Sequence, residues 1–479
     1  MKSILILASI IYLSLSNIYC LAKETKQDEG ILKVGLIVPL SGRHQEIGKS
    51  VLNSIRLALS KINDDQIEIF PKDNYSNPEK TLLAARQLEK EGIQIVIGPI
   101  FHKNLIYLEE VKDIIFLSLS NKTKIIPSNV ITIGINANSQ INAIVNFIKK
   151  ENLNKTIVLI PRSNFEDELR NALVKSKYEF LNIYSYDVEP NKLTSQIEQI
   201  AAYSERKKNL EKIIEFLEKR IEVLEKEEEL EDLKKKYTLG EVDLDTVVIN
   251  EKELKNLKKK YTFLDIQIKE KELEDLKKKY TLGEVDLDTI VINEEELEDL
   301  KKKYTLGEVD LDTVVINEKE LKNLKKKYTL GEINFDSVII ANFGENLKSV
   351  TNSFSFSDVT AQDVKFITLN QWFDETLLKE SSTNQIYFPS INFTNYSKFR
   401  ETYFKSYNKY PLQISILSYD ILGLIYYIKK VQGNNLVKNI FNKKISYIGE
   451  AGEFLFEDKI VTHKLDIYQV FDNQFLKIN

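Results

Sequence analysis

Lys33-Val-Gly-Leu-Ile-Val-Pro-Leu-Ser-Gly42 is a short apolar run that ends in a proline and a polar turn. Further short apolar runs follow at 67–70, 93–97 and 114–117. Between them lie segments with helical spacing of apolar residues, 48–61 and the stretch that Pro78 opens at its first turn. Apolar strands that alternate with amphipathic helices predict a parallel sheet covered on both faces.

A second cycle of the same kind starts near Val130, which predicts a two-lobed α/β protein with a cleft between its lobes. Its expected strands and helices alternate along the chain at 130–133, 139–150, 156–160, 165–177 and 184–188. We assign 31–135 and 386–440 to the N-terminal lobe. We assign 136–200, 332–385 and 441–479 to the C-terminal lobe, and 201–331 to an insertion.

Open parallel sheets bind ligands at the loops that follow the carboxyl ends of their strands. These loops hold the candidate cleft residues, which are all neutral or acidic. From the first lobe they are Ser41, Gly42, Asp73, Gly98, Pro99, Ser118, Ser120 and Asn121. From the second lobe they are Phe165, Glu166 and Asn342, with Trp372 a candidate for either core packing or cleft lining.

The insertion contains a tandem repeat. Lys234-Lys-Lys-Tyr-Thr-Leu-Gly-Glu241 recurs at Lys277, Lys301 and Lys325, and a diverged copy begins at Lys258. We read each unit as a helix, a Thr-Leu-Gly turn and a strand such as 241–249, so that units stack or extend the neighbouring sheet. A flexible arm is the alternative. We expect removal of 234–323 to leave the host fold intact.

Before the repeats, five apolar residues recur with heptad spacing, namely Leu210, Ile214, Leu217, Ile221 and Leu224. Two heptads favour a long amphipathic helix or a helical hairpin over a dimerising coiled coil, which normally needs three or four.

Several classes of function are disfavoured by composition. The net charge of the 479 residues is only -5, with both signs mixed, so no nucleic-acid partner is expected. A single cysteine excludes a disulfide framework, and three histidines far apart in sequence do not suggest a metal site. The Asp243-x-Asp245 pairs lack the other features of a Ca²⁺ loop. No nucleophile elbow, phosphate loop or zinc-protease motif is present. We therefore expect no enzyme activity, no catalytic residue, no metal and no cofactor.

Residues 1–22 are typical of an export signal, with Lys2 before the apolar run 4–15. Cys20 is a candidate for lipidation, and Cys20-Leu-Ala22 also fits ordinary cleavage. Residues 23–30 form a polar tether. We expect a periplasmic or cell-envelope protein, with or without a lipid anchor.

Four segments resemble the type I periplasmic-binding fold in its leucine/isoleucine/valine-binding-like branch. They are Val34 to Gly42 with Gly48, Asn77-Pro-Glu-Lys80 with Ala84-Ala-Arg86, Gly92 to Pro99, and Phe116-Leu-Ser-Leu-Ser120. Gly449-Glu-Ala-Gly452, followed by Phe454 and Phe456, is similar to the closing hairpin of that family.

Within the branch, Thr329-Leu-Gly-Glu-Ile-Asn-Phe-Asp-Ser-Val-Ile-Ile340 resembles the penicillin-binding protein activator lipoproteins. Segments 354–359 and 368–372 support this resemblance. It implies a cell-wall regulator that binds a membrane-bound synthase. The wider family implies a solute receptor for an ABC permease, with a small ligand such as an amino acid in the cleft. A surface interaction protein with a vestigial cleft is a third hypothesis.

The cleft departs from the pattern of the amino-acid-binding members. Ser41, Ser118 and Ser120 match serines of that pattern. Ile100-Phe-His102 replaces a serine-rich stretch, Phe165-Glu166 replaces Tyr-Gly, and Ala341-Asn-Phe343 replaces a glycine-rich strand end. These replacements disfavour tight capture of an α-amino acid, and so favour the regulator over the receptor.

Overall fold

The computed structural model describes residues 31–281, 293–298, 301–302, 330, 333–432, 444–457 and 459–478. The predicted export signal, Cys20 and the tether lie outside these residues, as do most of the last two repeat copies. The chain divides into two compact units. The first comprises Met1–Tyr186, Ser337–Leu347 and Lys365–Asn479, and the second Asp187–Asp336 and Lys348–Val364.

The first unit contains two sheets, one for each lobe. The sheet of the first lobe has the strand order β11-β12-β13-β5-β4-β3-β1-β2. Its strands are β1 (Leu32–Val38), β2 (Ile67–Asp73), β3 (Ile95–Ile97), β4 (Ile115–Ser118), β5 (Val130–Thr132), β11 (Ile445–Gly449), β12 (Gly452–Glu457) and β13 (Ile460–His463). β1 pairs in parallel with β2 on one side and with β3 on the other, as the apolar runs predicted.

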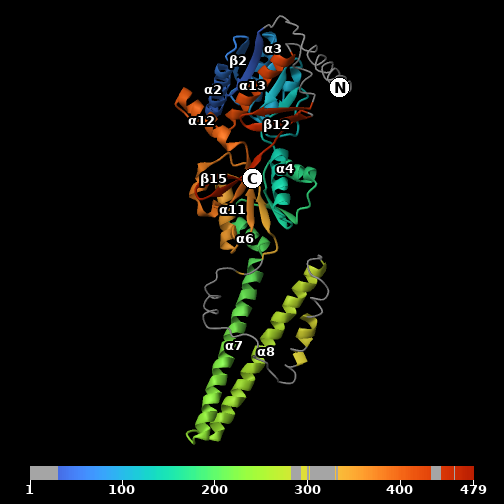
Figure 1. Cartoon of the computed structure of the whole chain (residues 1–479). Coiled ribbons are helices and arrows are strands. Elements are labelled where there is room, and N and C mark those ends of the chain that lie inside the picture. Colours follow the sequence, from blue (N-terminus) through green and yellow to red (C-terminus); the bar gives the residue numbers. More distant parts are fainter. Residues whose placement is uncertain are drawn as a thin grey trace, which may run out of the picture. The chain divides into compact units, whose positions relative to one another are not determined.

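Helices and short 3₁₀ turns cover this sheet (Figure 1). They are α2 (Gln45–Ile62), α3 (Pro78–Lys90), α12 (Phe393–Tyr407), α13 (Ser415–Gln432), η1 (His102–Leu105) and η2 (Leu108–Glu110). α13 packs against α2, and α3 packs against β1 and β2. The core between α3 and the sheet includes Leu88, Val96 and Phe116, which are fully buried. Each such side chain contributes roughly 1.5–3 kcal/mol to stability through burial.

The sheet of the second lobe has the strand order β15-β14-β10-β9-β8-β6-β7. Its strands are β6 (Thr156–Pro161), β7 (Asn182–Tyr186), β8 (Ser337–Ile340), β9 (Lys365–Thr368), β10 (Tyr387–Ser390), β14 (Asp466–Phe471) and β15 (Gln474–Ile478). The associated helices are α4 (Ala137–Lys150), α5 (Glu166–Ser176), η3 (Glu375–Lys379) and η4 (Ser381–Thr383). Ile144, Ile148 and Leu169 pack against Ile339 and Ile367 in its core.

The strands differ from the predicted lobe boundaries in two places, and 187–200 and 348–364 of the predicted C-terminal lobe belong to the second unit. β10 lies in the second sheet, where it pairs antiparallel with β14. β11, β12 and β13 lie in the first sheet, although 441–479 was assigned to the second lobe, because Ile460 of β13 pairs with Thr132 of β5. The chain therefore crosses between the sheets three times, after β5, β10 and β13.

Asparagine residues cap the N-termini of three helices. The side chain of Asn77 accepts a hydrogen bond from the N–H of Lys80, and Pro78 follows it at the first helical position of α3. Asn136 caps α4 through the N–H of Ser139, and Asn392 caps α12 in the same way. Such caps satisfy backbone donors that have no partner within the helix.

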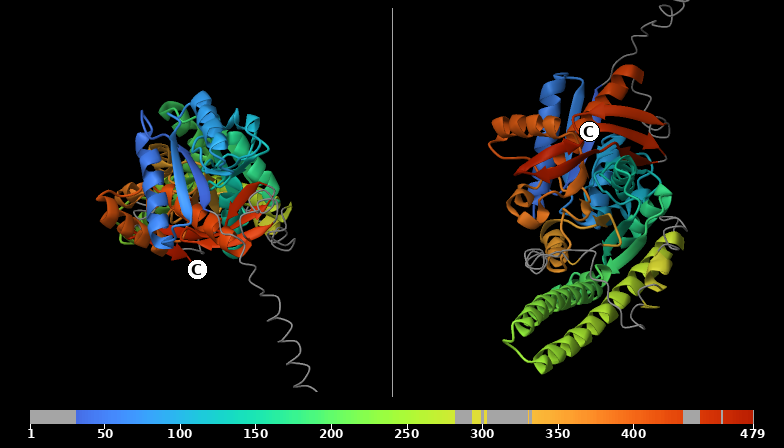
Figure 2. Two further views of the ribbon diagram at one scale, coloured as in Figure 1. Left: turned by 90° about the horizontal axis from the view of Figure 1, so that it is seen from above. Right: turned by 60° about the horizontal axis from the view of Figure 1, so that its bottom comes forward.

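The second unit contains α6 (Pro190–Ile200), α7 (Tyr203–Thr238), α8 (Leu244–Thr281) and most of α11 (Gly344–Phe356). α7 and α8 lie side by side as an antiparallel hairpin, which Figure 1 and Figure 2 show in green and yellow. The chain reverses at Gly240, whose φ of +75° is the left-handed conformation that glycine tolerates. None of the described helices is both long and apolar enough to cross a membrane.

The prediction of a strand at 241–249 is wrong, because α8 begins at Leu244. Asp243 caps this helix by accepting hydrogen bonds from the N–H of Thr246 at 2.8 Å and from its hydroxyl at 2.6 Å. The run Thr246-Val-Val-Ile249 has high β-propensity, but the cap at Asp243 and the packing of Val247 against α7 stabilise a helix.

The hairpin interface is repeated along the chain. Val223 and Leu230 of α7 pack against Val247, Leu254 and Tyr261 of α8. Farther along, Ile266 and Leu273 of α8 pack against Leu297. Three ion pairs occur twice, and the residue numbers of the second occurrence are always higher by the same amount. The pairs are Lys234–Glu251 and Lys277–Glu294, Lys226–Glu253 and Lys269–Glu296, and Lys258–Glu227 and Lys301–Glu270. The repeats therefore encode helix-against-helix contacts rather than helix-strand units.

The buried contact with α8 includes Phe216, Val223 and Leu230 of α7. Leu210, Ile214 and Ile221 of the predicted seam are half-buried, and the side chains of its other two members, Leu217 and Leu224, lie outside the described residues. Of the two predicted alternatives, the structure has a helical hairpin within one chain.

Arg206 at the start of α7 anchors the hairpin. Its guanidinium donates hydrogen bonds to the carbonyls of Ser357 at 3.2 Å and Asp358 at 2.9 Å, directly after the end of α11. The side chain of Asp358 also accepts a hydrogen bond from the N–H of Leu330. The first residues of α7 and Leu330 of the last repeat copy thus meet at Asp358.

Candidate functional site

Ser41 and Asp73 lie together at the carboxyl ends of β1 and β2. The Ser41 hydroxyl donates to Asp73 Oδ2 at 2.6 Å, and Asp73 Oδ1 accepts the N–H groups of Leu40 and Tyr75, each at 2.9 Å. Partial burial opposes ionisation of Asp73, but these hydrogen bonds lower its pKa below the usual value. The carboxylate and the hydroxyl are thus engaged with each other, and Gly42, at a φ of +74°, completes the turn.

Gly98, Pro99 and Ser118 lie together at the ends of β3 and β4. The Ser118 hydroxyl donates to the carbonyl of Pro99 at 2.8 Å, and its side chain is completely buried. A Cβ on Gly98 would lie 2.2 Å from the carbonyl oxygen of Ile37, so only glycine fits. Ser120 is also buried and accepts from the N–H of Lys122, whereas Asn121 is exposed. This group is part of the structure of the loop.

In the second lobe, the predicted residues at the start of α5 face their own lobe. Phe165 packs against the core of that lobe. Glu166 accepts hydrogen bonds from the Ser185 hydroxyl and from Arg170 Nε, the latter at 3.0 Å. The hydrogen bond from Ser185, supported by Arg170, lowers the pKa of Glu166.

Asn342 and Trp372 lie near the ends of β8 and β9. Asn342 Nδ2 donates to the buried hydroxyl of Tyr186 at 2.7 Å, and burial raises the pKa of Tyr186 to about 12. The carbonyl of Asn342 accepts from Thr368 at 2.8 Å and from Gln371 at 3.0 Å. Trp372 is half-buried, and its backbone φ is +50°.

Glu168, which the sequence analysis did not single out, joins the two lobes. It lies in the first turn of α5 and is 6% exposed. Its Oε1 accepts the N–H groups of Thr123 and Lys124, each at 3.0 Å, and its Oε2 accepts the Thr123 hydroxyl at 2.7 Å. Thr123 and Lys124 belong to the loop between β4 and β5 of the first lobe, so no local sequence pattern connects them with Glu168.

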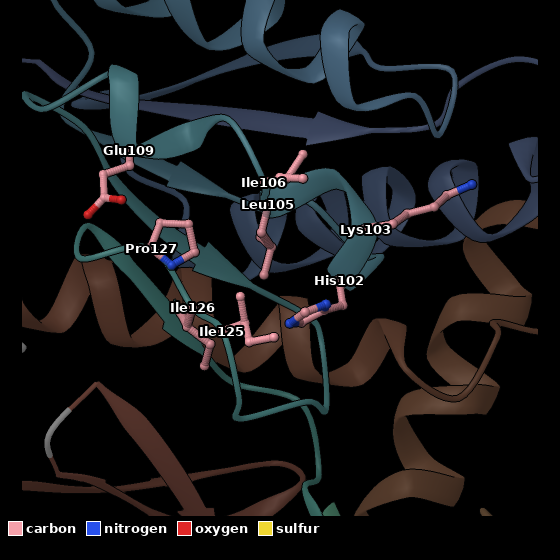
Figure 3. Close-up of a pocket in the computed structure, with 8 residues that line it drawn as sticks. All are labelled: His102, Lys103, Leu105, Ile106, Glu109, Ile125, Ile126 and Pro127. Atoms are coloured by element: carbon pink, nitrogen blue, oxygen red, sulfur yellow. The ribbon is translucent and has the colours of Figure 1, made fainter. Parts of the chain in front are cut away.

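The same loop borders a pocket of about 360 Å³ within the first lobe (Figure 3). The lining is mainly apolar and consists of His102, Lys103, Leu105, Ile106, Glu109, Ile125, Ile126 and Pro127. Ile106 is 66% exposed and Ile125 is 91% exposed. His102 Nε2 hydrogen-bonds the carbonyl of Lys124 at 2.8 Å, so this histidine supports the loop.

No group of His, Cys, Asp and Glu side chains in the described part of the chain has the arrangement of a metal site. Two isolated titratable residues are deeply buried away from the predicted cleft residues. Burial lowers the pKa of His463 to about 4, and burial raises the pKa of Asp420 to about 7. Each hydrogen-bonds backbone groups, so both are components of the fold rather than an acid–base pair.

The family model described as "Periplasmic binding protein" matches residues 31–203. A comparison with curated proteins found no match. Among solved structures, a putative branched-chain amino acid ABC transporter protein from Rhodospirillum rubrum is similar with a TM-score of 0.56 and 10% identity, over 94% of this chain and 100% of that one.

Two structures from Haemophilus influenzae are also similar. Full-length LpoA has a TM-score of 0.51 and 12% identity, over 94% of this chain and 59% of that one. The C-domain of LpoA, described as a regulator of PBP1A, has a TM-score of 0.49 and 11% identity, over 93% of this chain and 100% of that one. At these identities the similarity concerns the fold.

Proposed function

Since the chain has the two-lobed type I periplasmic-binding fold, we propose that it is a non-catalytic regulator of cell-wall synthesis that binds a membrane-bound synthase. It would act outside the cytoplasm, held at the membrane if Cys20 is lipidated. A folded module without chemistry changes a partner's rate by binding one of its conformations more tightly.

The observation that carries this proposal is that two serines predicted to bind a ligand already donate their hydroxyl hydrogens to other groups of the chain. Ser41 donates its hydroxyl hydrogen to Asp73, and Ser118 donates its own to the carbonyl of Pro99. An amino-acid carboxylate bound in the cleft needs such donors, and removing its water without replacing the hydrogen bonds costs about 1–3 kcal/mol per group, and more for a charged group. Both hydroxyls are occupied within the first lobe, which supports a partner surface over a small-ligand cleft.

Two further points support the same proposal. The sequence Leu330-Gly-Glu-Ile-Asn-Phe-Asp336 leads into β8 as in the activator lipoproteins it resembles. LpoA, whose full-length structure has this fold, is a protein described as a regulator of PBP1A. For the present chain, PBP1A-like synthases are therefore the partners to test first.

The direct test is a peptidoglycan polymerisation assay with the purified chain and each bifunctional synthase of its own organism. We expect the rate of one synthase to rise and to saturate at a fixed ratio of the two proteins. Glycan strands without synthase should remain unchanged. If no synthase responds and the chain co-purifies with an ABC permease, the regulator proposal is wrong.

Calorimetry with leucine, isoleucine and valine tests the solute-receptor alternative. We expect no binding at micromolar concentrations of amino acid. A micromolar or tighter dissociation constant would favour the receptor, because the Ser41 and Ser118 hydroxyls would then have to exchange partners on binding.

A further inference from the structure

The loop between β4 and β5 presents three hydrogen-bond donors to a single carboxylate. Two are the consecutive N–H groups of Thr123 and Lys124, and both point to one oxygen of Glu168. The third is the Thr123 hydroxyl, which points to the other oxygen. Consecutive backbone N–H groups directed at one acceptor are a known way of binding anions.

The loop conformation is fixed around these donors. Ile125, the next residue, has a φ of +53°, which is rare for a β-branched side chain. His102 Nε2 hydrogen-bonds the carbonyl of Lys124, the residue before Ile125. A backbone in a disfavoured conformation persists only when its surroundings hold it there. Here the surroundings that hold the loop include His102 and the Glu168 carboxylate.

We propose that Thr123 and Lys124 form a carboxylate-binding site that the chain itself fills with Glu168. The three donors give each carboxylate oxygen a partner, and the start of α5 places the charge at the positive end of a helix. Because Glu168 and its donors belong to different lobes, the filled site also links the lobes. Small carboxylates bind there only when the Glu168 carboxylate is absent.

The proposal is independent of any synthase, because it concerns the isolated chain. Glu168→Ala removes the carboxylate and leaves room for a small one. We expect this variant to have a lower Tm than the wild type, and acetate or propionate to raise that Tm by a few degrees in a saturable way, as ligand binding to a native state does. Chloride at the same ionic strength should not have this effect.

The matched control is Asp167→Ala, which removes an exposed carboxylate from the same helical turn. Its Tm should not respond to acetate beyond the response of the wild type. Thr123→Val combined with Glu168→Ala removes the third donor, and the acetate effect should become several-fold weaker. An acetate response of equal size in Asp167→Ala, or none in Glu168→Ala, would overturn the proposal.

A second measurement covers the case in which Glu168→Ala fails to fold. Glu168→Gln keeps the side-chain volume but places an amide N–H₂ where one carboxylate oxygen accepts. Spin labels at Lys90→Cys and Lys175→Cys, on exposed positions of α3 and α5 in a Cys20→Ser background, report the distance between the lobes. We expect the spin-label distances to be longer or more broadly distributed in Glu168→Gln than in the protein that retains Glu168. An unchanged distribution would show that Glu168 does not link the lobes.

Discussion

His463 is a buried residue whose charge state couples stability to pH. Its Nε2 lies 2.8 Å from the carbonyl of Ile133, and the Ser139 hydroxyl accepts its backbone N–H. Burial lowers its pKa from 6.5 to about 4. Between these values the unfolded chain binds a proton that the folded chain excludes, so stability falls as the pH drops from 6.5 towards 4.

We therefore expect His463→Gln to flatten this part of the pH profile. Glutamine retains an N–H donor for Ile133 but does not titrate. Between pH 7 and pH 5 the wild type should lose about 2 kcal/mol more unfolding free energy than the variant, at about 1.4 kcal/mol per unit. Urea titrations at both pH values measure this difference. His44→Gln, at the start of α2, is the control, and equal acid sensitivity of wild type and His463→Gln would contradict the prediction.

Asp420 of α13 should have the opposite pH dependence. It accepts the N–H groups of Glu450 and Ala451 in the β11–β12 turn, at 2.8 and 2.7 Å. Burial nevertheless raises its pKa from 3.8 to about 7, so the folded chain retains a proton that the unfolded chain releases. Its contribution to stability is complete below pH 3.8 and is lost as the pH rises to 7.

Asp420→Asn should destabilise the chain at every pH, because the amide presents N–H groups to a backbone N–H. The cost should be larger at pH 5 than at pH 8 by roughly 2.5 kcal/mol, since only the wild type has the stabilising protonation of Asp420 on acidification. Urea titrations at the two pH values test this. An equal cost at both pH values would mean that the carboxylate is ionised throughout and would contradict the prediction. Glu457→Gln, an exposed carboxylate of β12, is the control.

At the scale of elements, we expect the repeat arm to be removable only if α7 is removed together with the segment that returns to Leu330. α7 rises about 1.5 Å per residue, so Leu233 lies about 40 Å along the helix from Arg206. Removing 234–323 would leave six residues, spanning roughly 20 Å, to return from Leu233 to Leu330. Because Arg206 and Leu330 both contact Asp358, the earlier expectation that this deletion preserves the fold needs revision.

We expect replacement of 208–329 by a six-residue Gly-Ser linker to give a soluble protein with a cooperative unfolding transition. The linker joins two points that lie near the same aspartate. The deletion of 234–323 should break the contacts at Asp358 and lower the Tm by several degrees. Differential scanning calorimetry of the two variants compares them directly. Equal stability of the two would show that α7 is not anchored as described.

Arg206 itself can be tested by a single substitution in the second unit. Arg206→Gln removes buried hydrogen bonds to the carbonyls of Ser357 and Asp358, which should cost about 1–3 kcal/mol. Lys207→Gln, an exposed neighbour on the same helix, should cost less than 0.5 kcal/mol, roughly the range of surface changes. Amide hydrogen exchange along α7 and at the end of α11 measures the resulting loss of local stability. Equal exchange rates in the two variants would contradict the anchoring role.

The sequence predicted elements whose cause is local and missed those whose cause is distant. The apolar runs at β1, β3, β4 and β6 were assigned correctly, because strands buried on both faces have this composition. The start of α8 was misread as a strand, although Asp243 three residues before Thr246 is a helix-capping signal. Glu168 and the lobe of β13 could not be predicted, since their partners are Thr123 and Thr132, far away in the chain.

At the scale of the whole molecule, the last strands complete both lobes. β13 lies between β12 and β5 in the first sheet, and β14 pairs with β10 in the second. Truncation after residue 457 should therefore destabilise both sheets, whereas truncation after 473 removes only β15 at the edge of the second. Hydrogen exchange in β3 and β8 reports on the two sheets separately. If β3 in the chain truncated after residue 457 exchanges as slowly as in the full chain, β13 does not stabilise the first sheet and the prediction is wrong.

The three crossings of the chain also fix an order of events during synthesis. A ribosome releases residues from the amino end, so β5 has no β13 beside it and β10 has no β14 until the final residues emerge. The α7–α8 hairpin is made of contacts between neighbouring segments, so we expect it to form early, because local contacts form fastest. The two sheets therefore still lack β13 and β14 at a stage when we expect the arm to be folded. A chain that completes both sheets only at its end remains open for longest, the condition under which a polypeptide can still be threaded across a membrane.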